Sequence, residues 1–166
     1  YAALGTGHFG AHVWRRDEPG GAWVEVGAPA YPPRPDDATD VYTRQCSLDV
    51  TVHDLAVMAA TLANGGVNPV TGERVVGREV CRRVLAVMAT AGLYELSGDW
   101  LYEIGMPGKS GVSGGIVTVS PGKGGVATYS PPLDLAGNSV RGQLVTKYLA
   151  ERLGLNLFAS EAAPRD

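Results

Sequence analysis

The spacing of apolar residues along this chain changes from a helical period to an extended one and then back again. One helical face is predicted by four residues at the spacing i, i+3, i+4 and i+7, namely Leu55, Met58, Ala59 and Leu62. Residues 115–120 and 126–130 are instead short runs rich in Val and Thr, which is typical of strands. This order of helices, an antiparallel pair and a final helix predicts an α+β fold.

Local signals set the ends of the predicted helices. Thr51 and Asp54 form a capping-box pattern before the first helix, and Gly65-Gly66 ends it. A second helix is predicted over 78–90, with Gly92 as its stop and an apolar face of Val80, Val84, Leu85 and Met88. Ser139 is the expected cap of the last helix, whose predicted apolar face is Val140, Leu144, Tyr148 and Leu149, reaching Leu153.

The strand pair has a turn signal between its two runs. From Lys109 onward the chain is expected to be extended, and Pro121-Gly122-Lys123-Gly124-Gly125 separates the two runs. Pro131-Pro132 ends the second strand because proline cannot donate to a sheet. We therefore expect an antiparallel hairpin close to the middle of the fold.

Residues 1–40 differ in character from the rest of the chain. The runs 11–15 and 22–26 predict a loose β-hairpin, and the proline-rich stretch 30–37 is interpreted as a linker that cannot be helical. We place a boundary near Asp40, so that 1–40 is an atypical hairpin and linker segment. Residues 41–158 form the main domain, and 159–166 are a frayed tail.

Charge and composition exclude some functions. Lys and Arg number 14 against 17 Asp and Glu, a net charge of −3, and no basic cluster offers a surface for nucleic acid. No apolar stretch approaches the ~18–20 residues that a membrane span needs. The two cysteines, Cys46 and Cys81, are too few for a disulfide scaffold, and we expect reduced, buried thiols in a cytoplasmic protein.

Three patterns suggest chemistry. Residues 111–115 fit G-x-S-x-G, but a strand follows the serine and all three histidines precede it, which argues against a nucleophile elbow. His8 and His12 have a zinc-pair spacing, but Gly10 lies between them and no Glu follows His8, so a surface or packing role is favoured. Lys109-Ser110-Gly111 is similar to the strand triplet that lines one wall of penicillin-binding and β-lactamase sites.

Longer runs, taken together and in order, resemble the serine-dependent glutaminase family. They are Val41–Leu48, Asp54–Met58, Leu62–Pro69, Val84–Met88, Gly92–Tyr94, Ser97–Trp100, Gly105–Ile116, Ser130–Asp134 and Gly137–Gly142. The resemblance is continuous from about Asp40 to Phe158, and it covers runs beyond the general Lys-Ser-Gly wall. The chain is therefore identified as similar to the C-terminal portion of a glutaminase.

The resemblance implies a β-lactamase-like fold, with helices packed on an antiparallel sheet, and hydrolysis of L-glutamine to L-glutamate and ammonia without a cofactor or metal. A serine within S-x-x-K attacks the side-chain amide in that family. Tyr94 corresponds to the substrate-contacting tyrosine that exchanges a proton with the serine. Tyr42 corresponds to a tyrosine that hydrogen-bonds the bound amino acid, and the Val112 main-chain N–H to an oxyanion donor. Homo-oligomers are expected.

One departure from the family pattern bears on activity. The S-x-x-K spacing occurs here at Ser120 to Lys123, inside the strand turn and with no helix after it, so the nucleophile is expected to be missing from this chain. We therefore predict no meaningful glutaminase activity for the isolated polypeptide. Two alternatives are a catalytically inactive glutaminase-like fragment that acts as a binding or assembly module, and a related amidase or penicillin-type hydrolase.

Overall fold

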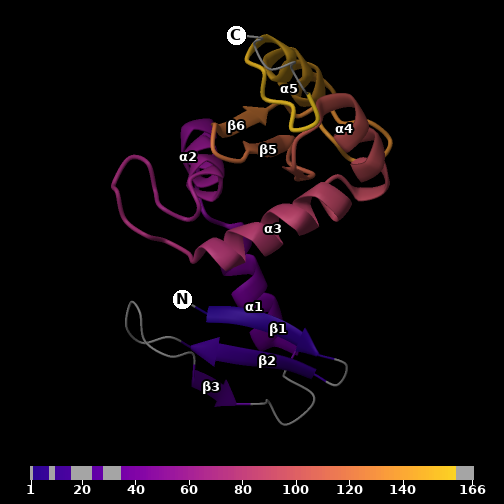
Figure 1. Cartoon of the computed structure of the whole chain (residues 1–166). Helices are drawn as coiled ribbons and strands as arrows, with labels where there is room; N and C mark the ends of the chain where they lie inside the picture. Colours follow the sequence, from indigo (N-terminus) through magenta and orange to yellow (C-terminus); the bar gives the residue numbers. More distant parts are fainter. Residues whose placement is uncertain (1, 8–9, 16–23, 28–34, 160–166) are drawn as a thin grey trace. The chain divides into compact units, whose positions relative to one another are not determined.

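The computed structural model describes residues 2–7, 10–15, 24–27 and 35–159 (Figure 1). Contacts divide the chain into two compact units, Tyr1–Asp49 and Val50–Asp166, and each is described by itself. The predicted boundary near Asp40 stays a prediction. The predicted tail lies outside the described residues, apart from residue 159.

The first unit contains an antiparallel sheet of order β1-β2-β3, formed by β1 (Ala2–Gly7), β2 (Gly10–Arg15) and β3 (Val24–Gly27). Pairing of Arg15 with Val24 confirms the hairpin predicted between 11–15 and 22–26 as far as the described residues reach. Strand β1 was not predicted. Its sequence contains three small residues and two glycines, which hide the strand pattern.

Helix α1 (Pro35–Cys46) corrects the prediction that 30–37 cannot be helical, because residues 35–37 form its first turn. Proline is tolerated at the first helical position, where its missing N–H would have had no intrahelical partner. Asp36 and Asp37 follow it and complement the positive end of the helix dipole. Residues 28–34 lie outside the described part of the chain.

The second unit is built on the sheet β4-β5-β6, which is antiparallel throughout. Strand β4 (Gly108–Ser110) pairs with β5 (Gly115–Ser120), and β5 pairs with β6 (Gly124–Tyr129). The predicted extended start near Lys109 and the predicted hairpin are confirmed. The last strand begins two residues earlier than expected, because Gly124 and Gly125 pair with Ser120 and Val119 instead of extending the turn.

Helices cover both faces of this sheet. Helix α2 (Val52–Ala63) lies so close to one face that a Cβ on Gly125 would be 2.4 Å from the Ala59 Cβ. Ala59, Val119 and Met88 are buried together on this face. On the other face, α4 (Ser97–Ile104) and α5 (Val140–Arg152) approach the strands, and Leu93, Trp100, Ile104, Met106, Ile116 and Ala150 form the core.

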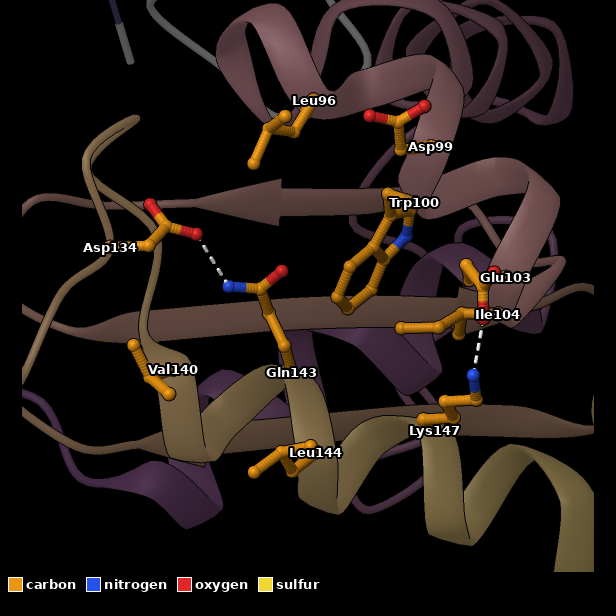
Figure 2. Close-up of a pocket in the computed structure, with 10 residues that line it drawn as sticks. All are labelled: Leu96, Asp99, Trp100, Glu103, Ile104, Asp134, Val140, Gln143, Leu144 and Lys147. Carbon is orange, nitrogen blue, oxygen red and sulfur yellow. Dashed lines mark hydrogen bonds and ion pairs between the residues drawn. The ribbon is translucent and has the colours of Figure 1, made fainter.

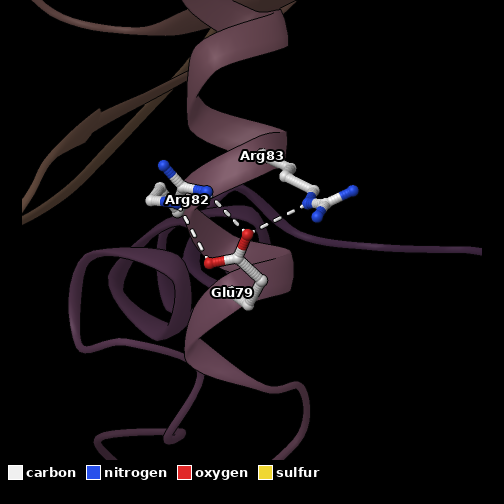
Figure 3. Close-up of polar contacts among 3 residues, drawn as sticks. All are labelled: Glu79, Arg82 and Arg83. Atoms are coloured by element: carbon white, nitrogen blue, oxygen red, sulfur yellow. Dashed lines mark hydrogen bonds and ion pairs between the residues drawn. The ribbon is translucent and has the colours of Figure 1, made fainter.

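Helices α2 and α3 (Arg78–Ala91) begin and end as their signals predict. Thr51 and Asp54 form the complete capping box of α2, and the Gly92 N–H closes α3 on the Met88 carbonyl. At the start of α3, Glu79 accepts hydrogen bonds from Arg82 and Arg83 (Figure 3). The hydrogen bond from Arg82, then that from Arg83, holds the pKa of Glu79 below its usual value.

The buried faces of the helices agree with the prediction only in part: Ala59 and Met88 are buried, and Leu62 and Leu85 pack against them. On α3, Cys81 and Met88 are buried, whereas Val80 and Val84 are exposed, and on α2 Met58 is exposed. On α5 the predicted residues Val140, Leu144, Tyr148 and Leu153 are all exposed. Its buried residues are Gly142, Thr146 and Ala150, because only small side chains fit where the helix approaches β6, and a Cβ on Gly142 would be 2.8 Å from Thr128 Oγ1.

Helix α4 was not predicted. Gly98 in its first turn, and the absence of a side-chain cap, remove the usual start signals. The signal that remained was the i, i+4 spacing of Trp100 and Ile104, both buried, followed by Gly105 in the left-handed conformation at φ 69°. The indole N–H of Trp100 donates to the Met106 carbonyl at 2.8 Å, which fixes the helix end against the chain that enters β4.

Candidate functional site

Tyr94 adopts a backbone conformation that its residue type disfavours. It begins the 3-10 turn η1 (Tyr94–Leu96) with φ 55°, and among the described residues no other non-glycine residue has a positive φ. For a bulky side chain this left-handed region costs on the order of 1–2 kcal/mol, and such strain concentrates at functional sites. This conformation was not predicted, because positive φ is normally signalled by Gly or Asn.

Buried groups on both sides hold Tyr94 in this conformation. The Ser97 hydroxyl accepts a hydrogen bond from the Leu93 N–H at 2.9 Å and donates one to the Tyr94 carbonyl at 2.7 Å. The Asn138 side-chain amide donates to the Leu93 carbonyl at 3.4 Å. Ser110 of β4 donates its N–H to the Gly92 carbonyl at 3.0 Å, which ties the segment to the sheet.

The Tyr94 ring lies beside Lys109 and Gly137. The Lys109 Nζ is 5.2 Å from the ring centroid, within the range of a cation–π contact, and it also donates to the Ser110 carbonyl. A Cβ on Gly137 would lie 3.7 Å from Tyr94 Cε2 and 3.8 Å from Val112 Cγ1. Tyr94 is therefore close to Lys109 and, across Gly137, close to Val112. It is 43% exposed, so a ligand can reach it.

Val112 lies in the tight loop between β4 and β5. Gly111 donates its N–H to the Gly115 carbonyl at 2.9 Å, and Gly114, at φ 102°, approaches the Ser130 carbonyl so closely that no side chain would fit. No group among the described residues accepts a hydrogen bond from the Val112 N–H. The loop leads directly into β5, so Ser113 is not on a strand-to-helix elbow and the G-x-S-x-G interpretation fails.

The residues of the S-x-x-K and histidine patterns lie elsewhere in the fold. Ser120 is buried at the end of β5 with its hydroxyl donating to the Leu155 carbonyl at 2.9 Å, and Lys123 donates to the Gly154 carbonyl. This pair is therefore engaged in holding the segment after α5, as expected of a spacing without a catalytic role. His12 lies on strand β2, and His8 lies outside the described residues.

Tyr42 belongs to α1 in the first unit and is exposed. Its hydrogen bond with the Cys46 side chain, one turn later, raises the pKa of the phenol, and the charge of Cys46 acts in the same direction. The phenol therefore stays protonated at neutral pH and can donate a hydrogen bond. Cys46 is itself exposed, which corrects the prediction of two buried thiols, whereas Cys81 is buried as predicted.

Asp134 organises the loop that presents Gly137 to Tyr94. Its Oδ1 accepts from the N–H groups of Ala136 at 3.0 Å and Asn138 at 2.9 Å, and its Oδ2 accepts from the Gln143 amide at 2.8 Å. Partial burial raises the pKa of Asp134, but the N–H donors of Asn138, Gln143, Ala136 and Gly137 outweigh it and lower the pKa below its usual value. The bond from the Ala136 N–H, two residues on, is an Asx turn, which the aspartate in this loop could have signalled.

The lowered pKa of Asp134 predicts an acid-sensitive loop. A carboxylate whose pKa is lower when folded contributes stability above its unfolded pKa of about 4, and loses it as the pH falls through the folded value. We expect Asp134→Asn to be less stable than the unchanged chain at pH 7, with a gap that narrows as the pH falls below about 4. Urea denaturation from pH 3 to pH 7 measures this, and a gap of equal size at both ends would contradict it.

A separate groove of about 380 Å³ lies between α4 and α5 (Figure 2). Its lining residues are Leu96, Asp99, Trp100, Glu103, Ile104, Asp134, Val140, Gln143, Leu144 and Lys147. An ion pair between Lys147 and Glu103 crosses one end of it, and the Asp134–Gln143 hydrogen bond crosses the other. Tyr94 and Val112 are not part of its lining, although Leu96, at the end of η1, and Asp134 are.

Neither a metal-binding cluster nor a membrane-spanning helix is present among the described residues. Within the described ranges, no group of three or more His, Cys, Asp or Glu side chains could hold a metal ion. In the same part of the chain, none of the helices combines the length and the apolar character that crossing a bilayer requires.

The arrangement of helices on the antiparallel sheet β4-β5-β6 defines the class of fold, which is β-lactamase-like. A solved structure described as probable glutaminase ybaS matches with a TM-score of 0.73 at 53% identity, covering 75% of this chain and 40% of that one. A covalent complex of the Bacillus subtilis glutaminase YbgJ with 5-oxo-L-norleucine matches with a TM-score of 0.71 at 34% identity, covering 74% and 44%. The predicted fold class, an incomplete α+β arrangement of helices on an antiparallel sheet, is confirmed.

The sequence profile of the Glutaminase family matches residues 30–158, and the chain belongs to this family. Glutaminase 2 of Yersinia pestis is 67% identical over 124 residues, which cover 75% of this chain but 36% of that protein. The chain thus spans well under half the length of the relatives that it matches. The predicted family is confirmed, whereas the roles of Tyr42, Tyr94 and Val112 stay predictions.

Proposed function

We propose that this chain carries one wall of a glutaminase active site, for hydrolysis of L-glutamine to L-glutamate and ammonia. The observation that carries the proposal is the strained Tyr94 next to Lys109 and Val112, within the segment that matches the Glutaminase family. The Bacillus subtilis relative reacts covalently to hold 5-oxo-L-norleucine, an amino acid with a carbonyl where glutamine has its carboxamide. The diazo reagent that forms this complex, 6-diazo-5-oxo-L-norleucine, loses dinitrogen from carbon 6, so the covalent bond forms next to this carbonyl and supports an enzyme nucleophile placed close to the carboxamide position.

Each proposed residue has a defined task. A serine hydroxyl bonds to the carboxamide carbon, its proton passes to the Tyr94 oxygen, and from there to the nitrogen as the C–N bond breaks and ammonia leaves. Water then cleaves the ester and releases glutamate. Lys109 lies beside the Tyr94 ring and places a positive charge close to the residue that transfers the proton. The Val112 N–H, which has no hydrogen-bond acceptor among the described residues, donates to the oxyanion.

The serine of this reaction is expected to come from outside the present sequence. Ser120 and Lys123, which have the S-x-x-K spacing, donate hydrogen bonds to the carbonyls of Leu155 and Gly154 in the segment after α5. We therefore expect the pure chain to bind glutamate weakly through its half of the site and to release no ammonia from glutamine. A cytoplasmic location agrees with the free thiols of Cys46 and Cys81 and remains part of the proposal.

A second candidate function, a binding or assembly module, is favoured by a separate observation. Val80, Val84 and Val87 are exposed at the spacing i, i+4 and i+7 and form an apolar stripe along α3. Such stripes mark surfaces that are covered by protein. The two candidates are compatible, because a chain that holds half of an active site needs a partner to complete it, which also agrees with the expected oligomer.

The experiment is a thermal-shift titration of the pure chain with L-glutamate. We expect the Tm to rise with glutamate, and Tyr94→Phe to remove most of the rise because the ring stays and only the hydroxyl is lost. Val112→Ala should keep the rise, since only its main-chain N–H is used. Tyr102→Phe, at an exposed position of α4, is the matched control and should leave the rise in Tm unchanged.

Two results would count against this function. A glutamate-induced rise that is the same in Tyr94→Phe and in the unchanged chain would remove Tyr94 from the site. Ammonia release by the pure chain that disappears in Tyr94→Phe would show that a nucleophile is present after all.

A further inference from the structure

We propose that Ser97 and Asn138 are positioning residues that set the direction of the Tyr94 phenol; this rests on the proposed function of Tyr94. Neither residue was predicted to have a role at the site. The inference comes from which peptide groups the two side chains hold, and from how deeply they are buried.

The backbone angles of Tyr94 are determined by the two peptide planes that flank it. The preceding plane contains the Leu93 carbonyl, which accepts from the Asn138 amide at 3.4 Å. The following plane contains the Tyr94 carbonyl, which accepts from the Ser97 hydroxyl at 2.7 Å. Each carbonyl also accepts a backbone hydrogen bond of the turn, from the Leu96 N–H at 3.1 Å and from the Ser97 N–H. The two buried side chains add a second bond to each plane and so hold φ and ψ of Tyr94 in the unfavourable left-handed region.

Both side chains are buried, so these bonds are hard to replace by water. Ser97 is 4% exposed and Asn138 is fully buried. The single Ser97 hydroxyl also accepts from the Leu93 N–H at 2.9 Å, so its loss leaves this buried N–H without a partner and removes the side-chain bond to the Tyr94 carbonyl. The segment is then free to relax to a negative φ, and relaxation turns the phenol away from Lys109.

Asn138 connects the same tyrosine to the Asp134 loop. Its N–H donates to the Asp134 carboxylate at 2.9 Å, and its carbonyl accepts from the Asp134 N–H at 2.8 Å. Gly137, its neighbour, lies against the Tyr94 ring and Val112. One loop therefore positions the ring through Gly137 and the backbone through Asn138, while neither Ser97 nor Asn138 reaches the proposed substrate.

A spectroscopic test measures the position of the ring without any ligand. The Tyr94 ring lies over the end of the Lys109 side chain, so NMR of the full chain should show the Lys109 ε-CH₂ protons shifted upfield by the ring. We expect Ser97→Ala and, independently, Asn138→Ala to abolish this shift, and Ser97→Thr to retain it because the hydroxyl is kept. Should one alanine variant fail to fold, the other decides.

The matched control is Ser120→Ala. Ser120 is as buried as Ser97, and its hydroxyl donates to a backbone carbonyl at a similar distance, but it lies at the end of β5 and its bond is to Leu155, after α5. It should lose comparable stability and keep the Lys109 shift. The proposal is overturned if Ser97→Ala and Asn138→Ala keep the shift, or if Ser120→Ala removes it equally.

Glutamate titration of the same variants provides the second measurement. If the unchanged chain binds glutamate, Ser97→Ala should weaken binding by about tenfold or more, as expected when a binding group is displaced, and Ser97→Thr should restore it. If the unchanged chain does not bind, the proposed function fails while the Lys109 shift still decides the roles of Ser97 and Asn138. Normal binding by Ser97→Ala would contradict the positioning role.

Discussion

Gly92→Ala should lower the free energy of unfolding of the Val50–Asp166 unit by about 3 kcal/mol, at the upper end of what overpacking usually costs. A Cβ at this position would lie 1.7 Å from the Gly108 carbonyl oxygen and 2.5 Å from the Met88 carbonyl oxygen. Both atoms belong to the backbone, so the end of α3 and the start of β4 would have to separate. Urea denaturation followed by circular dichroism measures the loss.

Gly98→Ala is the matched control for this substitution. Gly98 lies in the first turn of α4, and a Cβ there would meet nothing within 4 Å. Alanine is the better helix former by about 0.5–1 kcal/mol, so this variant should be slightly more stable than the unchanged chain. If Gly92→Ala proved as harmless as Gly98→Ala, the close approach of α3 and β4 would be wrong.

The contact at Gly92 also matters for the candidate site. Gly92 accepts a hydrogen bond from the Ser110 N–H, and Tyr94 follows two residues later. A displacement of this segment from β4 therefore separates the Tyr94 ring from Lys109. We expect Gly92→Ala to lose any glutamate-induced rise in Tm along with its stability.

The parts of the fold that were predictable depend on short-range chemistry. The capping box at Thr51 and the stop at Gly92 involve groups within four residues of each other, so the sequence alone shows them. The buried face of α5 depends on distance to another element instead. There Gly142, Thr146 and Ala150 are buried because they are small, while the larger Leu144 and Tyr148 are exposed. A rule that buries the largest apolar residues selects the wrong face.

The candidate site was predictable only through family resemblance. From pattern alone Tyr94 is an ordinary tyrosine after a helix stop, and nothing in its neighbours signals a positive φ. The groups that hold it come from 97 and from 138, and the second is 45 residues away from Leu93. Such a contact exists only after the chain has folded, which is why Asn138 was missed.

Tyr94→Gly should separate stability from function. Glycine adopts a positive φ without strain, which recovers on the order of 1–2 kcal/mol. Loss of the ring contacts with Lys109 and Gly137, and the greater freedom of glycine in the unfolded chain, oppose this by a similar amount. We therefore expect the free energy of unfolding to change by less than about 1 kcal/mol, while the glutamate-induced rise in Tm disappears.

We expect Tyr102→Gly to lose stability and to keep glutamate binding, the opposite of Tyr94→Gly. Tyr102 lies inside α4 and is 86% exposed, so its ring contributes little and glycine costs about 1 kcal/mol of helix stability. Glutamate binding should be unchanged. Because the two substitutions are chemically identical, only the backbone conformation and surroundings of the tyrosine distinguish them. A loss of stability in Tyr94→Gly larger than that in Tyr102→Gly would mean that Tyr94 is held for packing, and that its left-handed backbone carries no strain.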